Sequence, residues 1–340
     1  MRNGKKMMEL LEQGPVTAAV AVSGPWAGES MLYQNRNGKN RLAVETSDRL
    51  KVFWEKTGEL LDQSTFPVQL EIDGTKVFAE RLIQEPELVI LGGGHVSLEL
   101  AGLAHYLEYP YTVIDDREEF ASRERFPEAK ECICRPFSQV LEERSFSPNA
   151  YYVIVTRGHA HDLECLERIL KRPCGYVGMI GSRGKVKKVM DALREQGYSQ
   201  EKLDTVHAPI GLPIGGETPK EIGISIIAQL VQVKNKEQPG SYVDAGMKAA
   251  LSEGRPGVMA TIIEKKGSAP RGVGSRMLVG ADGIICGTIG GGMVEYQAEE
   301  DARKLLGSGR CLTRHYRLDN QSAASLGMWC GGEVEVLFEA

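Results

Sequence analysis

The sequence contains no apolar run near the roughly 20 consecutive residues that a membrane-spanning helix requires. Its first residues, MRNGKKMMELLEQG, carry positive charge but lack the apolar segment of a signal peptide, so we expect a cytoplasmic protein without a membrane anchor. Cysteine is scarce, and the seven residues occur without repeated C-x-x-C pairs. This pattern excludes an iron–sulfur enzyme and a disulfide scaffold, and it favours free thiols in a reducing compartment.

An excess of basic charge is also missing. The formal net charge is -5 and the Lys and Arg residues are scattered along the chain, so no nucleic-acid partner is expected. Charged residues make up 26% and hydrophobic residues 42% of the chain, which is typical of a globular protein. With 340 residues the chain is long enough for two or three domains.

The chain is organised around residues 86–120, PELVILGGGHVSLELAGLAHYLEYPYTVIDDREEF. An apolar run meets three glycines, a helical pattern follows, and a second apolar run ends in two aspartates. Strand, glycine turn, helix, strand and acid in this order predict the first βαβ unit of a dinucleotide-binding domain. Strand and helix patterns continue to alternate to about residue 235, which predicts a doubly wound parallel sheet.

The candidate binding residues of this motif are Gly92, Gly94, His95 and Asp115. Gly92 permits the tight turn, and Gly94 lets backbone N–H groups at the helix N-terminus approach a phosphate. Asp115 follows Gly94 by 21 positions, where an acid that binds ribose is expected. Ser97 stands at the third glycine position of the pattern. A glycine turn that binds nothing remains the alternative.

The two ends of the chain resemble each other. The stretch from Met7, MMELLEQGPVTAAVAVSGPWAGESMLY, is similar to the stretch from Met247, MKAALSEGRPGVMATIIEKKGSAPRGVGSRMLV. We predict related units at residues 1–82 and 242–340 on either side of a Rossmann-like domain at 86–235, with 232–241 as a linker. Only the second unit contains GTIGGGMVEY and WCGGEV, so the first is expected to have lost the site and to serve structure.

A second glycine-rich constellation lies in the C-terminal unit, and its candidate residues are Gly290, Gly291, Gly292, Glu295, Arg271 and Arg276. Consecutive glycines before a helix, expected to begin near Val294, expose N–H groups that suit phosphate or another polyoxoanion. The two arginines suit bidentate pairing with such an anion. Two interpretations of the glutamate stay open, a capping acid favoured by the helix dipole or a functional carboxylate. For the glycines the alternative is a tight turn without a ligand.

Two further motifs are candidates for binding. Cys330 and Gly331 lie in WCGG, where a thiolate would ligate a soft metal or hold a persulfide, although a buried small hydrophobic residue is the alternative. The second motif follows a predicted strand and predicts another anion subsite, with the residues Gly181, Ser182 and Arg183. The run RGHAHD before it lacks the spacing of a preformed metal site, and Asp162 in it is interpreted as a helix N-cap.

Together these motifs resemble the XdhC/CoxI family, accessory proteins that mature molybdenum hydroxylases such as xanthine dehydrogenase. In the C-terminal unit the resemblance rests on GSAPR, GTIGGGMVE and CGGEVEVLFE, and in the middle domain on LGGGHVSLELAGLA, VIDDREEFA, YVGMIGSRGK and PIGLPIGGETPKEI. It implies an α/β fold, with a Rossmann-like parallel sheet domain plus an XdhC/CoxI-type domain assembled from N- and C-terminal units. The domain order is permuted, because the glycine-rich unit usually comes first in the family.

The resemblance also implies a function. Members are thought to bind molybdenum cofactor (molybdopterin), to protect it during sulfuration and to pass it to a hydroxylase such as xanthine dehydrogenase. A cysteine desulfurase as a second partner and a homodimer are the corresponding expectations, and a maturation factor is favoured over a turnover enzyme. The alternative is an NAD(P)-dependent oxidoreductase, based on Gly92, Gly94 and Asp115. Against this alternative, the sequence shows no recognisable catalytic Lys, Tyr–Lys or Cys–His set. No metal ligands are assigned.

Overall fold

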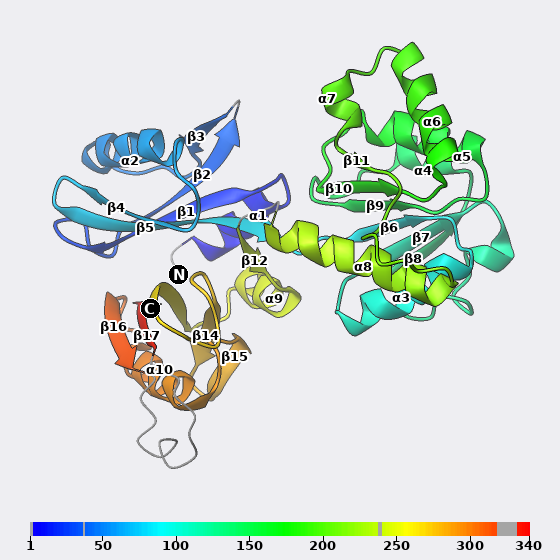
Figure 1. Ribbon diagram of the computed structural model, residues 1–340. Helices are drawn as coiled ribbons and strands as arrows, with labels where there is room; N and C mark the ends of the chain where they lie inside the picture. Colours follow the sequence, from blue (N-terminus) through cyan, green and yellow to red (C-terminus); the bar gives the residue numbers. More distant parts are fainter. Residues whose placement is uncertain (1–2, 37, 237–239, 318–331) are drawn as a thin grey trace. The chain divides into compact units, whose positions relative to one another are not determined.

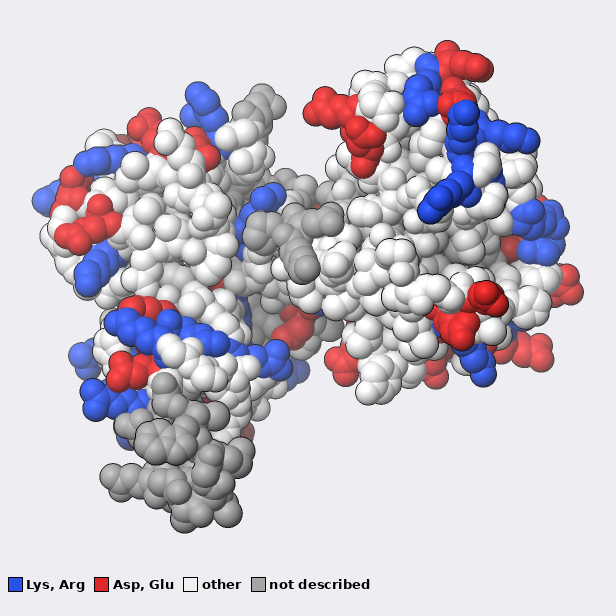
Figure 2. All heavy atoms as spheres, viewed as in Figure 1, with Lys and Arg blue, Asp and Glu red and all other residues white. Residues whose placement is uncertain are grey.

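The computed structural model describes residues 3–36, 38–236, 240–317 and 332–340 (Figure 1). The chain divides into two compact units: residues 1–84 together with 239–340, and residues 85–238. No helix among the described residues is long and apolar enough to cross a membrane. On the visible face of each unit, Lys and Arg are interspersed with Asp and Glu (Figure 2).

The unit of residues 85–238 is built on a parallel sheet with the strand order β11-β10-β9-β6-β7-β8. Its strands are β6 (Leu88–Leu91), β7 (Tyr111–Asp115), β8 (Glu131–Cys134), β9 (Tyr151–Ile154), β10 (Tyr176–Met179) and β11 (Val206–His207). The order reverses between β6 and β9, as in doubly wound dinucleotide-binding sheets, which bind ligands outside the carboxyl ends of the strands at this point. The predicted parallel sheet is confirmed.

Helices cover both faces of this sheet, and they are α3 (His95–Tyr106), α4 (Phe137–Glu143), α5 (His159–Ile169), α6 (Arg183–Glu195), α7 (Gln200–Leu203) and α8 (Pro219–Lys236), with a short 3-10 turn at Glu118–Phe120. Successive strand residues point to opposite faces, so Leu88 and Ile90 pack with α3 and α8 while Val89 and Leu91 pack with α4, α5 and α6. Burial on both faces explains why the central strands β6 and β9 are continuous apolar runs.

The helix α8 corrects the predicted linker at 232–241, because it continues to Lys236. Ile226, Leu230 and Val233 recur at helical spacing along one side of α8 and are buried against the sheet. Their burial stabilises the helix through a stretch whose polar composition had suggested a connection.

The other unit contains two sheets, each with five antiparallel strands in the same topology. The N-terminal repeat consists of α1 (Gly4–Leu11), β1 (Val16–Ser23), β2 (Ser30–Arg36), β3 (Lys39–Leu42), α2 (Asp48–Leu61), β4 (Val68–Ile72) and β5 (Thr75–Gln84). The C-terminal repeat consists of α9 (Ala245–Glu253), β13 (Val258–Lys266), β14 (Arg276–Gly280), β15 (Gly283–Gly287), α10 (Gly292–Leu305), β16 (Cys311–Arg317) and β17 (Glu333–Glu339). A short strand, β12 (Ser241–Val243), pairs with β5.

The pairing of the first strand with its two neighbours agrees between the repeats, whereas the β14–β15 hairpin has a register shift that β2–β3 lacks. Their strand orders are β4-β5-β1-β2-β3 and β16-β17-β13-β14-β15. The first strand of each repeat has a bulge against the last strand, between Ala21 and Ser23 in one and between Ile262 and Glu264 in the other. When these bulges are superimposed, the Met-Leu pair at 31–32 in β2 coincides with the Met-Leu pair at 277–278 in β14.

Candidate functional site

The first glycine turn connects β6 to α3 and is tightly enclosed. Gly92 has φ 106°, and a Cβ atom on it would lie 2.5 Å from the carbonyl oxygen of Val155. A Cβ atom on Gly93 would lie 1.8 Å from the carbonyl oxygen of Phe120. Gly94 precedes the helix with open space around its Cα. Packing therefore requires glycine at the first two positions, and only the third faces outward.

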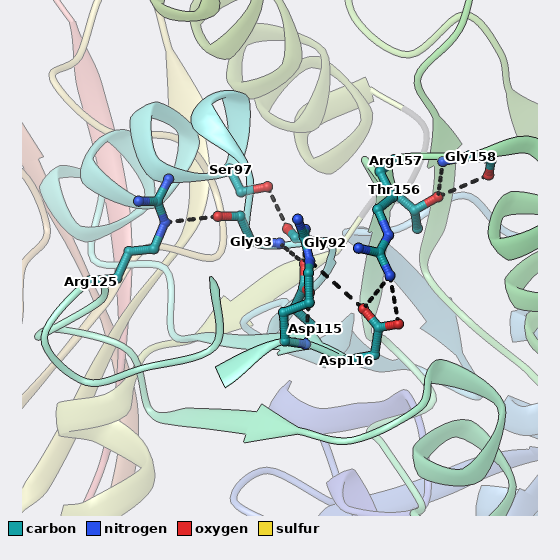
Figure 3. A network of polar contacts seen from close by, with 10 residues as sticks. Gly92, Gly93, Ser97, Asp115, Asp116, Arg125, Thr156, Arg157 and Gly158 are labelled. Atoms are coloured by element: carbon teal, nitrogen blue, oxygen red, sulfur yellow. Dashed lines mark hydrogen bonds and ion pairs between the residues drawn. The ribbon is translucent and has the colours of Figure 1, made fainter. Parts of the chain in front are cut away.

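Asp115, at the end of β7, closes this turn (Figure 3). Its Oδ2 accepts the Gly93 N–H at 2.8 Å, and the guanidinium of Arg117 donates to both of its oxygens at 2.9 and 3.0 Å. Burial alone raises the pKa of Asp115, but the hydrogen bonds from Arg117 and Gly93 outweigh burial and lower the pKa from its ordinary value. Asp115 is thus an ionised brace between turn and strand, with its oxygens already engaged.

The other residues around the turn divide into internal and exposed groups. Ser97, at the third glycine position, is buried and its hydroxyl donates to the carbonyl oxygen of Gly92, so it locks the turn to the helix. Arg125 donates to the carbonyl oxygen of Gly93 at 2.8 Å (Figure 3). His95 is exposed at the start of α3. Gly94 and His95 are therefore the predicted residues that remain accessible here.

The loop after β9 lies across the switch point from the glycine turn. The Thr156 hydroxyl donates to Asp162 at 2.6 Å. Arg157 pairs with Asp116 at 3.0 Å (Figure 3). The helix α5 begins at His159, with Gly158 as its N-cap, so the prediction that Asp162 is the N-cap is wrong. Asp162 is instead a fully buried carboxylate that forms an ion pair with Lys185.

In the predicted anion subsite after β10, some of the residues are engaged in contacts within the protein. Ser182 is the N-cap of α6 and accepts the backbone N–H of Lys185 at 3.3 Å. A Cβ atom on Gly181 would lie 2.8 Å from the Lys185 side chain, which turns toward Asp162. Arg183 is exposed, and no ion-pair partner for it lies within the described part of the chain. Of this motif, Arg183 is the cation that remains accessible.

The second glycine turn, Gly290–Gly292, connects β15 to α10 in the C-terminal repeat. All three glycines have positive φ, 125°, 75° and 67°, which other residues rarely adopt. A Cβ atom on Gly290 would lie 3.0 Å from Pro270 and 3.4 Å from Arg271, so the loop with the predicted arginine packs on this turn. Gly291 and Gly292 face open space. The helix begins at Gly292 rather than near Val294.

Glu295 holds this turn from within its own helix. Its carboxylate accepts the backbone N–H groups of Ile289 at 2.9 Å and Gly291 at 3.2 Å and the hydroxyl of Thr288. Burial raises the pKa of Glu295, but these hydrogen bonds outweigh burial and lower the pKa from its ordinary value. Of the two interpretations left open, the geometry shows the capping role.

The two arginines predicted to share the anion site differ in burial and in their partners. Arg271 is exposed beside the glycine turn, and within the described ranges no ion pair occupies it. Arg276 is buried, with 7% of its side chain exposed, and forms an ion pair with Glu80 of the N-terminal repeat. It also donates to the carbonyl oxygen of Gly274 at 3.1 Å. The structure therefore brings Arg271, but not Arg276, to the glycine turn.

Several residues that shape these sites were missed by the sequence analysis. Arg117 and Thr288 had a local signal, since each stands within two positions of a predicted site residue. Glu80 had none, because 196 positions separate it from Arg276. Cys330 and Gly331 lie outside the described residues. Within the described ranges, no group of three or more His, Cys, Asp or Glu side chains is arranged to hold a metal ion.

Comparison with known protein families agrees with this architecture. Residues 88–230 match the family model of the XdhC Rossmann domain, and residues 250–317 match that of the XdhC and CoxI family. The first match spans the parallel sheet from β6 to α8, and the second contains the Gly290–Gly292 turn. The two matches together cover more than half of the chain, which belongs to the XdhC/CoxI family.

Three curated relatives are similar over part of their length. "Uncharacterized protein YqeB" of Escherichia coli is 33% identical over 193 residues, which is 56% of this chain and 34% of the relative. A probable xanthine dehydrogenase subunit of Bacillus subtilis is 27% identical over 162 residues, 48% of this chain and 47% of the relative. The "molybdenum cofactor insertion chaperone PaoD" of E. coli is 43% identical over 61 residues, 18% of this chain and 19% of the relative. The chain thus spans less than half of each relative.

Proposed function

We propose that this protein is an accessory factor for a xanthine dehydrogenase-type molybdenum hydroxylase, which binds molybdenum cofactor as cargo and delivers it to the apo-hydroxylase. The observation that carries the proposal is the presence of both family domains in one chain, with an open glycine turn in the XdhC/CoxI match. Similarity to a cofactor insertion chaperone and to a probable xanthine dehydrogenase subunit supports the same role.

The exposed groups around the second glycine turn fit the chemistry of this cargo, a pterin with a phosphate and a metal–oxo group. The N–H groups of Gly292, Met293 and Val294 begin α10 and have no acceptor in a preceding helical turn, so they suit an anion. Since Glu295 adds negative charge nearby, the exposed Arg271 is the balancing cation. Met293 and Tyr296 are 64% and 61% exposed on the first turns of the helix and suit contact with a flat ring.

The proposal assigns the protein a protecting and handing-over role. The bound cofactor is sulfurated by a cysteine desulfurase partner, which supplies the sulfur, and the hydroxylase then receives the finished cofactor. The residues of this chain bind and orient the cargo, and no side chain is assigned a bond-making step.

Cofactor content after gentle purification tests the site. Arg271→Ala removes the exposed cation and Gly291→Asp puts a carboxylate into the cradle, so both are expected to lower the molybdopterin content at least tenfold relative to wild type. Arg255→Ala is the matched control, because this arginine of the same repeat pairs with Glu253 on the surface. Cys330→Ala tests whether the thiol of Cys330, another residue predicted to bind the cofactor, contributes to the molybdopterin content. Equal molybdopterin in wild type, Arg271→Ala and Gly291→Asp would reject the site.

Nucleotide binding by the parallel-sheet unit is a second candidate, favoured by its strand order and by the open Gly94 at the switch point. The engaged oxygens of Asp115 argue against the usual contact with ribose. Titration with NADH, followed by its fluorescence, separates the two candidates. Micromolar binding together with hydride transfer would establish the NAD(P)-dependent oxidoreductase, and absence of binding would eliminate it.

A further inference from the structure

A buried ion pair joins the two repeats. Arg276 at the start of β14 and Glu80 in β5 each have 7% of the side chain exposed, and the guanidinium also donates to the carbonyl oxygen of Gly274. Gly274 in turn belongs to the loop 267–275, which carries Arg271 to the glycine turn. A carboxylate of the N-terminal repeat therefore anchors the end of a loop that belongs to the C-terminal repeat.

The repeated strand register identifies the counterparts of these two residues. Glu80 pairs with Ala18 in β1 and Glu339 pairs with Met259 in β13, and both glutamates occupy the same place relative to the bulge. By the same register, Arg276 of β14 corresponds to Ser30 of β2. The glutamate is thus present in both repeats, but the arginine is present only in the C-terminal one.

The apolar contacts between the repeats also involve corresponding residues. Met7 and Leu11 of α1 lie in one buried cluster with Met247 and Leu251 of α9, their counterparts in the sequence repeat. A second cluster contains Phe78 together with its counterpart Leu337. An interface in which the same surface patch appears on both sides is the arrangement found between two copies in a symmetric dimer.

We propose that the N-terminal repeat is a built-in partner, which occupies the place of a second C-terminal repeat and supplies Glu80 to anchor the loop that carries Arg271. In a pair of identical C-terminal repeats, Glu339 of each copy would meet Arg276 of the other. Here one of the two ion pairs is kept, as Arg276–Glu80, and the other is lost because Ser30 replaces the arginine.

This arrangement gives one glycine turn of the Gly290–Gly292 type to each chain. The loop that Glu80 anchors packs against the Gly290–Gly292 turn. The N-terminal repeat therefore contributes to the site, although its own sequence contains no such glycine turn. Strand register and contacts carry this assignment, which does not depend on which cargo binds.

Restoring the lost arginine tests the equivalence of the repeats. Ser30→Arg in the full chain is expected to raise the Tm by about 2–4 °C, the shift typical of one additional favourable ion pair in a unit of this size. Ser30→Met is the control for side-chain length and is expected to give no rise. The gain of Ser30→Arg should disappear when Glu339→Gln is also present. A gain that persists with Glu339→Gln, or an equal shift with Met, would overturn the built-in-partner assignment.

Amide hydrogen exchange tests the positioning role of Glu80 separately. Glu80→Gln keeps the shape of the side chain but removes its charge, and it is expected to speed exchange in the loop 267–275 at least tenfold at short labelling times. Glu85→Gln, which breaks the Lys234 ion pair of the other unit, is the matched control and should leave this loop unchanged. Leu61→Ala removes a buried side chain from the core of the N-terminal repeat and lowers the Tm, but it should also leave exchange in the loop unchanged. Unaltered loop exchange in Glu80→Gln, or an equal acceleration in Leu61→Ala, would overturn the role.

Discussion

Each of the two glycine turns of this chain leads into a helix, but the carboxylates that hold the turns come from different places. The turn at Gly92–Gly94 is braced by Asp115 from the neighbouring strand, and Arg117 covers both oxygens of that carboxylate. The turn at Gly290–Gly292 is braced by Glu295 from its own helix, through backbone N–H groups and a hydroxyl. In the first turn the charge is neutralised locally, and in the second it is not.

This difference goes together with a difference in accessibility. At the first turn, close packing against Val155 and Phe120 and the paired Asp115 leave mainly Gly94 accessible. At the second turn, Gly291 and Gly292 face open space and Arg271 is exposed beside them. The first turn matches the usual dinucleotide pattern more fully, yet the second is less enclosed by neighbouring backbone.

The largest expected effect comes from removing the brace of the first turn. Asp115→Ala leaves the Gly93 N–H without its acceptor and Arg117 without its counter-ion, so we expect a loss of about 3–5 kcal/mol in the free energy of unfolding. Urea unfolding measures this. Asp116→Ala, which removes a partly exposed carboxylate paired with Arg157, is the control and should cost less than about 1 kcal/mol. Equal losses would contradict the bracing role.

An intermediate effect is expected from adding a single methyl group to the first turn. Gly93→Ala places a Cβ atom 1.8 Å from the carbonyl oxygen of Phe120 and should cost about 1–3 kcal/mol or more. Gly94→Ala meets nothing within 4 Å and should be nearly neutral. Thermal unfolding of the two variants compares an enclosed with an open position one residue apart. Similar Tm values would show that the turn can relax.

The smallest effect is expected at the second turn. Glu295→Gln weakens the acceptor of two backbone N–H groups, and since the side chain is only partly buried we expect a loss of roughly 0.5–2 kcal/mol, as for a helix cap. The control is Glu299→Gln, further along α10, which forms an ion pair with Arg303 in the same helix. A loss no larger than that of the control would argue against the brace.

The pH dependence of the free energy of unfolding tests the same role of Glu295, because the direction of its pKa shift fixes the direction of the expected change. The pKa of Glu295 is lower in the folded protein than its unfolded value of about 4.3, so its stabilisation is complete above the unfolded pKa and is lost as the pH falls through the folded pKa. Denaturant unfolding between about pH 5 and pH 2 should therefore show a shallower decline in Glu295→Gln than in wild type. Identical slopes would indicate that Glu295 has the same pKa folded and unfolded.

Much of the fold was predictable because the signals are local. The apolar run at 88–91, the glycines after it and the acid at 115 specify the first βαβ unit within one stretch of chain. Hydrophobic periodicity was less informative for α8, where apolar residues buried on one side extend the helix into a polar stretch. Site residues were predicted by type and spacing, which locate a glycine turn but do not show whether its neighbours are already engaged.

The sequence by itself determined the parallel sheet, the two glycine turns and the family, since each depends on residues close together in the chain. Only the tertiary structure decided which candidate groups are accessible. Asp115 is covered by Arg117, Lys185 turns to the buried Asp162, and Arg276 is held by Glu80 from the other repeat. The physical reason is that a buried charge needs a partner, and that partner can come from any part of the chain that folding brings near.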